Sequence, residues 1–238
     1  MKFKILTLFP QIFPGPLNHS LIGKAFQEGK FTIEVINIRD FSDKKSKSVD
    51  DTPYGGGAGM IIKANIMQKA LDHVKISLGS KSKIVYLSPG GKPLNSKIAN
   101  SLKNFKELVL ICGKYEGIDQ RFIEKNNIEE ISIGDYVLSG GELASFILID
   151  TCVRLIPEVL GNKNSLKSES FNDDLLEYPQ YTKPLDWDGM KVPNVLLNGN
   201  HKEISEWRLK KSIEKTKKVR PDLLKKYESK KKEEKWTH

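Results

Sequence analysis

The stretch Glu107-Leu108-Val109-Leu110-Ile111-Cys112-Gly113-Lys114-Tyr115-Glu116-Gly117 contains the structural unit that recurs along this 238-residue chain. Residues 108–112 form an unbroken apolar run of strand length, and residues 113–117 form a turn bounded by glycines. An unbroken apolar run predicts a strand that is buried on both faces, as in a parallel sheet covered by helices.

The first 160 residues alternate between strand-like and helix-like segments. Strands are predicted at residues 3–9, 31–38, 83–88, 107–112 and 130–134, and helices at 17–29, 63–76, from about 95, and at 143–155. Strands separated by single helices require crossover connections. The pattern therefore predicts an α/β fold with a mostly parallel sheet and helices on both faces.

The character of the chain changes beyond residue 160. The polar segment 161–171 is predicted to be a linker. Residues 172–238 hold several prolines and a helical stretch from Lys202, but no strand pattern. We therefore expect a main domain at 1–160, a linker at 161–171 and a small helical domain at 172–238.

Positive charge is concentrated toward the carboxyl terminus. The chain carries 39 Lys and Arg against 30 Asp and Glu, and 14 of these bases against 7 of these acids lie from His201 onward. Such a segment is either a solvated helix face or a surface that binds a polyanion through its phosphates. Trp207 among Arg208, Lys210 and Lys211 adds an aromatic group, which favours RNA over a membrane surface.

Neither a membrane span nor a secretory leader is predicted. The apolar stretch Val137–Leu160 contains Glu142, Asp150, Arg154 and Glu158, which a simple span would not tolerate. The amino-terminal segment lacks a basic region followed by an apolar core and a cleavage site. We expect a cytoplasmic protein without a membrane partner.

Three glycine-bearing turns follow predicted strands: Pro89-Gly90-Gly91, Gly113–Gly117 and Ser139-Gly140-Gly141. In a parallel sheet these turns share the edge where ligands bind, and glycine lets the backbone approach a ligand closely. The chain lacks both Gly-x-Gly-x-x-Gly and the phosphate-binding loop, so cofactors gripped by their phosphates are disfavoured. A cofactor held by backbone amides and apolar walls fits better.

Other kinds of catalytic site find little support. The four histidines are scattered, so no metal site is predicted, and Cys112 and Cys152 are expected to be buried free thiols. Arg154 interrupts an apolar helix, and a buried arginine is either part of a structural ion pair or a site residue. A lone linker glutamate such as Glu169 is more often solvated than catalytic.

Several longer motifs stand in order along nearly the whole chain. They are Asp50–Met60 (DDTPYGGGAGM), Tyr86–Pro89 (YLSP), Cys112–Asp119 (CGKYEGID), Ser132–Glu142 (SIGDYVLSGGE), Leu175–Thr182 (LLEYPQYT) and Glu206–Lys210 (EWRLK). Together they resemble the bacterial tRNA (guanine-N1)-methyltransferase family. The resemblance implies a SPOUT-type fold with a deep trefoil knot, a homodimer with a composite active site, and S-adenosyl-L-methionine as cofactor. It also implies tRNA with guanine at position 37 as the substrate.

The resemblance assigns the cofactor to three segments. The residues implied are Tyr86, Leu87, Pro89, Gly113, Tyr115, Glu116, Gly117, Ser132, Ile133, Gly134, Asp135, Tyr136, Val137, Leu138, Gly140 and Gly141. Tyr115 and Tyr136 could equally be core aromatics, the commoner role for such residues.

Methylation of guanine at N1 needs a base for the N1 proton and a cation near O6. The family uses a linker aspartate as the base, and the matching position here is Glu169, a departure that keeps the carboxylate and a similar reference pKa. We expect Glu169 still to serve, with Asp135 and Asp174 as the next candidates. Arg154 matches the family's arginine and would stabilise charge at O6.

The resemblance also bears on the partners of the protein. Asp50, Trp207, Arg208, Lys210 and Lys211 are implied in tRNA binding. Mg²⁺ is implied without a dedicated protein site, held by water and RNA.

Three rival functions compete with this one. One is a knotted methyltransferase for another RNA position, against which Asp50–Met60 and Leu175–Thr182 argue. The second is a non-catalytic RNA-binding relative, which a degenerate cofactor loop would have indicated. The third is a nucleotide-dependent oxidoreductase, which lacks its glycine fingerprint here.

Overall fold

The computed structural model describes residues 1–161, 169–171 and 173–236. The chain divides into two compact units, Met1–Gly161 and Asn162–His238. Each unit is described by itself below.

The first unit is built on a five-stranded sheet. Its strands are β1 (Lys2–Thr7), β2 (Thr32–Asn37), β5 (Ser82–Pro93), β6 (Glu107–Cys112) and β7 (Glu129–Ser132), in the order β2-β1-β6-β5-β7. Every pairing within this sheet is parallel. The predicted α/β fold with a parallel sheet is therefore confirmed.

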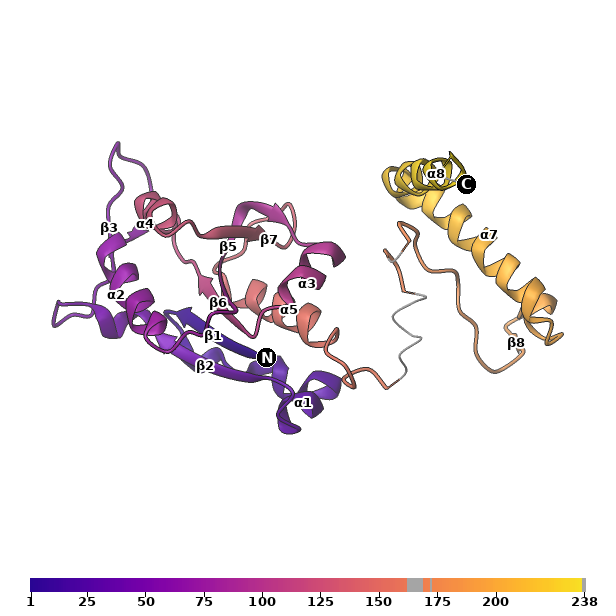
Figure 1. Ribbon diagram of the computed structural model, residues 1–238, viewed down its shortest axis with the longest axis horizontal. Helices are drawn as coiled ribbons and strands as arrows, with labels where there is room; N and C mark the ends of the chain where they lie inside the picture. Colours follow the sequence, from indigo (N-terminus) through magenta and orange to yellow (C-terminus); the bar gives the residue numbers. More distant parts are fainter. Residues whose placement is uncertain (162–168, 172, 237–238) are drawn as a thin grey trace. The chain divides into compact units, whose positions relative to one another are not determined.

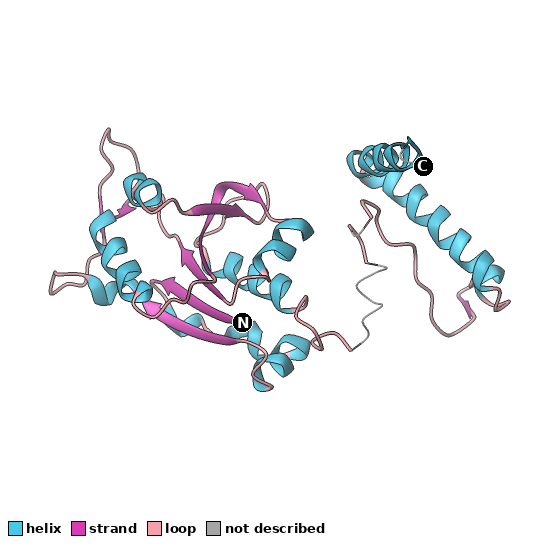
Figure 2. Ribbon diagram, viewed as in Figure 1, coloured by secondary structure: helices cyan, strands magenta, loops and turns pink. Residues whose placement is uncertain are grey.

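Helices cover both faces of the sheet (Figure 2). The helices α1 (Ser20–Gln27), α3 (Ser96–Leu102) and α5 (Glu142–Val153) contribute to one core, and α2 (Ala64–Lys75) and α4 (Gln120–Lys125) to the other. Strand β6 serves both cores, because its successive side chains alternate between the two faces. Leu110 and Cys112 belong to the first core, and Val109 and Ile111 to the second. The apolar run of this strand thus has the two-sided burial that its sequence predicted.

Strand β5 differs from its prediction. It extends to Pro93, and its register against β7 shifts between Leu87 and Lys92, since both of these residues pair with Ile131. The Pro89-Gly90-Gly91 segment is therefore an irregularity within the strand, not a turn that follows it. A Cβ on Gly91 would lie 2.4 Å from the backbone of Glu130, so glycine permits the close approach there.

Some short elements carry no sequence pattern and were not predicted. The two-residue strands β3 (Asp50–Asp51) and β4 (Ile61–Ile62) pair antiparallel and close the glycine-rich loop between them. The expected helix at 17–29 is split into a 3-10 turn, η2 (Gly15–Asn18), and α1, because His19 adopts an extended conformation between them. Two further 3-10 turns are η1 (Pro10–Ile12) and η3 (Ile38–Phe41).

The second unit contains two helices, α7 (His201–Val219) and α8 (Pro221–Trp236), after a short 3-10 turn, η4 (Asn194–Leu196). The Asn200 side chain caps α7 by accepting from the N–H groups of Lys202 and Glu203. Thr216 of α7 accepts a 2.8 Å hydrogen bond from the Leu176 N–H. The preceding segment is thereby attached to α7.

The expectation that this unit lacks strands is wrong. Strands β8 (Asp186–Trp187) and β9 (Met190–Lys191) form a small antiparallel hairpin. Its turn contains Gly189 at φ 78°, and the Gly189 N–H donates to the Asp186 carboxylate at 3.0 Å. Two residues on each side are too few for an alternating pattern to appear in the sequence.

Candidate active site

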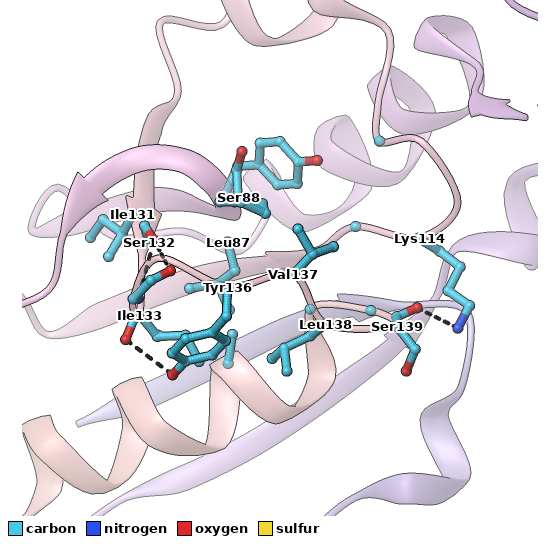
Figure 3. Close-up of a pocket in the computed structure, with 18 of the residues that line it drawn as sticks. Leu87, Ser88, Lys114, Ile131, Ser132, Ile133, Tyr136, Val137, Leu138 and Ser139 are labelled. Atoms are coloured by element: carbon cyan, nitrogen blue, oxygen red, sulfur yellow. Dashed lines mark hydrogen bonds between the residues drawn. The ribbon is translucent and has the colours of Figure 1, made fainter. Parts of the chain in front are cut away.

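A pocket lies at the interruption within β5 and at the carboxyl ends of β6 and β7, where three segments of the chain meet (Figure 3). The segments are 86–89, 113–117 and 131–141. Ala144, near the start of α5, completes the lining. The lining residues are Tyr86, Leu87, Ser88, Pro89, Gly113, Lys114, Tyr115, Glu116, Gly117, Ile131, Ser132, Ile133, Gly134, Tyr136, Val137, Leu138, Ser139, Gly140, Gly141 and Ala144.

All but one of the predicted cofactor residues lie on this lining. The exception is Asp135, which is exposed and absent from it. The Tyr136 N–H donates to the Gly134 carbonyl at 2.9 Å, a bond that spans two residues and places Asp135 at the tip of a tight turn. The position of Asp135 within the motif therefore does not bring it into the pocket.

Sequence reasoning missed five lining residues. Ser88, Lys114 and Ser139 lie inside the motifs already singled out, so their neighbours could have indicated them. Ile131 and Ala144 lie in a strand and a helix that read as ordinary core, and no signal in the sequence marks them.

The third segment is held by its own hydrogen bonds. The Gly134 N–H donates to the Ser132 hydroxyl at 3.2 Å, and that hydroxyl donates to the Gly134 carbonyl at 3.0 Å (Figure 3). The Tyr136 hydroxyl donates to the Ile133 carbonyl at 3.2 Å. Gly134 has φ 151°, and a Cβ there would lie 2.4 Å from the Tyr136 ring. Glycine is therefore required for the ring to fold back over the loop.

The second and third segments are joined directly. The Gly141 N–H donates to the Gly113 carbonyl at 2.9 Å, and the Lys114 ammonium donates to the Ser139 carbonyl at 2.5 Å. A Cβ on Gly141 would lie 2.8 Å from the Cα of Cys112. The start of α5 thus packs backbone against backbone on the end of β6.

The three tyrosines of the pocket have different environments. Tyr86 is buried beneath the glycine turn, and this burial together with the charge of Glu130 raises its pKa to about 12. Its hydroxyl is therefore protonated at neutral pH. Tyr115 and Tyr136 are 43% and 53% exposed, which rules out the alternative that they are core aromatics.

A buried carboxylate, that of Glu142, follows directly after the third segment of the pocket. Thr7, at the end of β1, donates a 2.7 Å hydrogen bond to Glu142 in the first turn of α5, and both side chains are buried. A negative charge at a helix amino terminus is stabilised by the helix dipole. Burial, and then the charge of Glu142, raise the pKa of the nearby Cys112 thiol. Cys112 and Cys152 are both buried free thiols, as predicted.

The chemistry of the lining is largely apolar and backbone. Leu87, Ile133 and Leu138 supply apolar surface, and the cation of Lys114 is engaged with a carbonyl. Glu116 adds an exposed carboxylate. Such a pocket is suited to an uncharged ring system beside a positive group, and Lys114 is the single Lys or Arg among the described residues that line it.

The catalytic candidates Arg154, Glu169 and Asp174 are all at least partly buried. Arg154 is half-buried and is the carboxyl-terminal cap residue of α5, one residue beyond the helix in which it was expected. Burial raises the pKa of Asp150, and the charge of Arg154 partly offsets this rise. Glu169 is half-buried and belongs to the second unit. Asp174 is buried and forms an ion pair with Lys230 of α8, so its carboxylate has a structural partner.

The predicted tRNA-binding residues lie in two places. Asp50 is half-buried in β3 of the first unit. Trp207, Arg208, Lys210 and Lys211 lie on α7, where Lys211 forms a 2.7 Å ion pair with Glu214. Trp207 is half-buried, whereas Arg208 and Lys210 are exposed.

Two features of the described residues bear on other classes of protein. No three His, Cys, Asp or Glu side chains gather there in a way that could hold a metal ion. In the same part of the chain, no helix combines the length and apolar character needed to cross a bilayer.

Comparison with known proteins bears out the resemblance seen in the motifs. Residues 1–226 match the family described as tRNA (Guanine-1)-methyltransferase TrmD. The tRNA (guanine-N(1)-)-methyltransferase of Anaplasma phagocytophilum (strain HZ) is 51% identical over 225 residues, which cover 94% of this chain and 96% of that protein. Proteins of the same name from Wolbachia pipientis wMel and Pelagibacter ubique (strain HTCC1062) are each 50% identical. These alignments cover 92% and 94% of this chain, and 94% and 97% of those proteins. The chain therefore belongs to the tRNA (guanine-1)-methyltransferase family.

Proposed function

We propose that this protein transfers a methyl group from S-adenosyl-L-methionine to N1 of guanine 37, the base 3′ of the anticodon in tRNA. The observation that carries the proposal is the meeting of segments 86–89, 113–117 and 131–141 in one pocket, the last two of them rich in glycine, in a member of a family named for guanine-1 methylation of tRNA. The carboxyl edge of a parallel sheet is the usual place for such a site.

The residues present fit this cofactor. Leu87, Ile133 and Leu138 provide apolar walls for an adenine ring, and backbone amides and carbonyls provide partners for its edges. S-adenosyl-L-methionine supplies a methyl group on a positively charged sulfur when it is bound. The carboxylate of Glu116 is the charged side chain of the lining that suits such a cation.

The proposed catalytic groups are Glu169 and Arg154. Glu169 accepts the proton from N1, since a neutral guanine cannot be alkylated there without losing it. Arg154 directs its guanidinium toward O6, where negative charge accumulates as the proton leaves. Arg154 belongs to the first unit of the chain and Glu169 to the second.

We further propose a SPOUT-type trefoil knot and a homodimer. The knot is supported by membership in the family, because the resemblance to that family implies a fold of this type. Leu143 and Ile147 lie one turn apart on α5 and are 56% and 44% exposed, which offers apolar surface to a second copy. The methyltransferase domain would span 1–160, the linker 161–171 and the tRNA-binding domain 172–238.

Two properties follow from a tRNA substrate. The protein would act in the cytoplasm, where tRNA is found. Any Mg²⁺ would be held by water and by RNA phosphates rather than by a cage of protein side chains.

The test is mass analysis of tRNA after incubation with the enzyme and isotopically labelled cofactor. One transcript carries guanine at position 37 and a matched transcript carries adenine there. We expect 1-methylguanosine at position 37 of the first transcript and no labelled nucleoside in the second. A label at another position would favour a different RNA methyltransferase. Tight tRNA binding without any label would favour a non-catalytic relative.

A further inference from the structure

A groove on the second unit combines aromatic rings with unpaired cations. It lies between the extended segment that begins at Tyr178 and the first turns of α7, which run beside each other (Figure 1). Tyr181 and Lys183 contribute from the segment, and Trp207 and Arg208 from the helix. None of the described residues that line this groove is Asp or Glu.

The rings of the groove are supported but not covered. The Tyr181 ring lies 6.2 Å from the Trp207 ring, centroid to centroid, with an angle of 56° between the planes. Tyr181 nevertheless remains 48% exposed. The Arg208 guanidinium lies 4.9 Å from the centroid of the Tyr178 ring. The arrangement presents an aromatic surface that is held in place on one side and open on the other.

The cations of this groove are not neutralised by nearby acids. Within the described part of the chain, neither Lys183 nor Arg208 forms an ion pair. The basic groove beside α4 in the first unit is different, because three of its four cations, Lys63, Lys69 and Arg121, each pair with an aspartate. The groove on the second unit is therefore the better binding surface for an anion.

We propose that this groove binds one unpaired nucleotide of the tRNA, with its base stacked on Tyr181 and its phosphate beside Lys183 and Arg208. The inference rests on the proposed function and adds to it a place for a second nucleotide besides the methylated guanine. An unpaired nucleotide offers both a flat aromatic face and an anionic phosphate. An apolar protein surface would match the rings but would leave the two cations unpaired.

The direct test compares substitutions of Tyr181 in the full-length enzyme. Tyr181→Leu removes the ring and keeps an apolar side chain, Tyr181→Phe keeps the ring, and Trp187→Leu removes an aromatic side chain that is 65% exposed and outside the groove. We expect Tyr181→Leu to raise the KM for tRNA by roughly 5- to 150-fold, the range that loss of one base–aromatic stack produces. The other two variants keep the parent's value, and the KM for S-adenosyl-L-methionine is unchanged in all three.

The second test locates the nucleotide. Single abasic sites are introduced at each unpaired position of the tRNA other than 37, and binding to the parent and to Tyr181→Leu is measured. We expect one position at which the abasic site weakens binding to the parent by a factor similar to the Tyr181→Leu effect. At that position the abasic site has no further effect on the variant, because the same stack is already lost.

The outcomes separate this inference from the function on which it rests. A parent enzyme that methylates no tRNA refutes the proposed function, whatever Tyr181 does. An active parent with an unchanged KM for tRNA in Tyr181→Leu refutes the groove alone. A raised KM with no coupled abasic position also overturns the inference. A change of oligomeric state by sedimentation overturns it too, and shows an interface between copies.

Discussion

Substitution of Gly141 by alanine tests whether the close contact between α5 and β6 shapes the pocket. Gly141 has φ −79° and ψ −6°, a conformation that alanine adopts without strain. On conformational entropy alone the substitution would stabilise the protein by about 0.4–1 kcal/mol. The new Cβ, however, would lie 2.8 Å from the Cα of Cys112 and 2.9 Å from the amide nitrogen of Gly113.

The size of the effect follows from these distances. Ordinary van der Waals contact begins near 3.4 Å, so the start of α5 must move about 0.6 Å away from β6. The 2.9 Å hydrogen bond from the Gly141 N–H to the Gly113 carbonyl then lengthens toward 3.5 Å, where little of it remains. Overpacking costs about 1–3 kcal/mol and outweighs the entropic gain, so we expect a net loss of about 1–2 kcal/mol in the free energy of unfolding.

The same movement separates two walls of the pocket. We expect the Kd for S-adenosylhomocysteine, the demethylated form of the cofactor, to rise by about tenfold, because small displacements of positioned groups are costly. Urea unfolding and isothermal titration calorimetry measure the two effects. The matched control is Gly90→Ala, since the nearest atom to a Cβ there is the Ser88 hydroxyl at 3.7 Å. If Gly141→Ala matches Gly90→Ala in both measurements, the contact has no role in forming the pocket.

Three further predictions concern the base, a buried hydrogen bond and an ion pair. Glu169→Gln should retain cofactor binding and lower the single-turnover rate of methyl transfer by about 100-fold or more. Glu169→Asp should retain most of the rate. A parental rate in Glu169→Gln would show that the base is misassigned. Thr7→Val leaves the buried Glu142 carboxylate without its 2.7 Å donor and should lower the free energy of unfolding by about 1.5–3 kcal/mol in urea, while Thr7→Ser, which keeps the hydroxyl, should lose less. Hydrogen bonds from Lys2 and Lys4 lower the pKa of Glu34. The stability that the ionised Glu34 contributes to the folded state is therefore complete above the ordinary carboxyl pKa, and it is lost as the pH falls through the lowered pKa. The stability difference between the parent and Glu34→Gln should therefore shrink between pH 5 and pH 3 (about the range of ordinary carboxyl titration), and a constant difference would contradict the ion pair.

The main domain could be predicted well because its signals are local. Strand β6 is apolar on both faces, and the glycines at 113 and 117 mark the turn that follows it. Parallel strands bring their carboxyl ends to one edge, so the turns at Gly113–Gly117 and Ser139-Gly140-Gly141 could be assigned to a common site before their contacts were known, whereas Gly90 and Gly91 lie outside that pocket. The hairpin of β8 and β9 escaped prediction because strands of two residues contain no period to detect.

The candidate site was predicted less completely than the fold of the main domain. Asp135 stands inside a pocket-forming motif, yet the hydrogen bond between Tyr136 and Gly134 places it at the tip of a turn. Ile131 and Ala144 line the pocket although their own segments are typical of buried core. Which side of a loop a residue occupies depends on hydrogen bonds that the residue type alone does not determine.

By itself, the sequence determined the order of strands and helices along the chain, the apolar segments that had to be buried, and the positions where glycine lets the backbone turn. These properties depend on neighbours within a few residues. Only the tertiary structure decided that β1 lies between β2 and β6, that β5 is interrupted opposite Ile131, and that Thr7 bonds Glu142 across 135 positions of sequence. Such pairings are selected by the packing of whole elements against each other, because each long-range contact must offset the entropy of closing the chain between its ends.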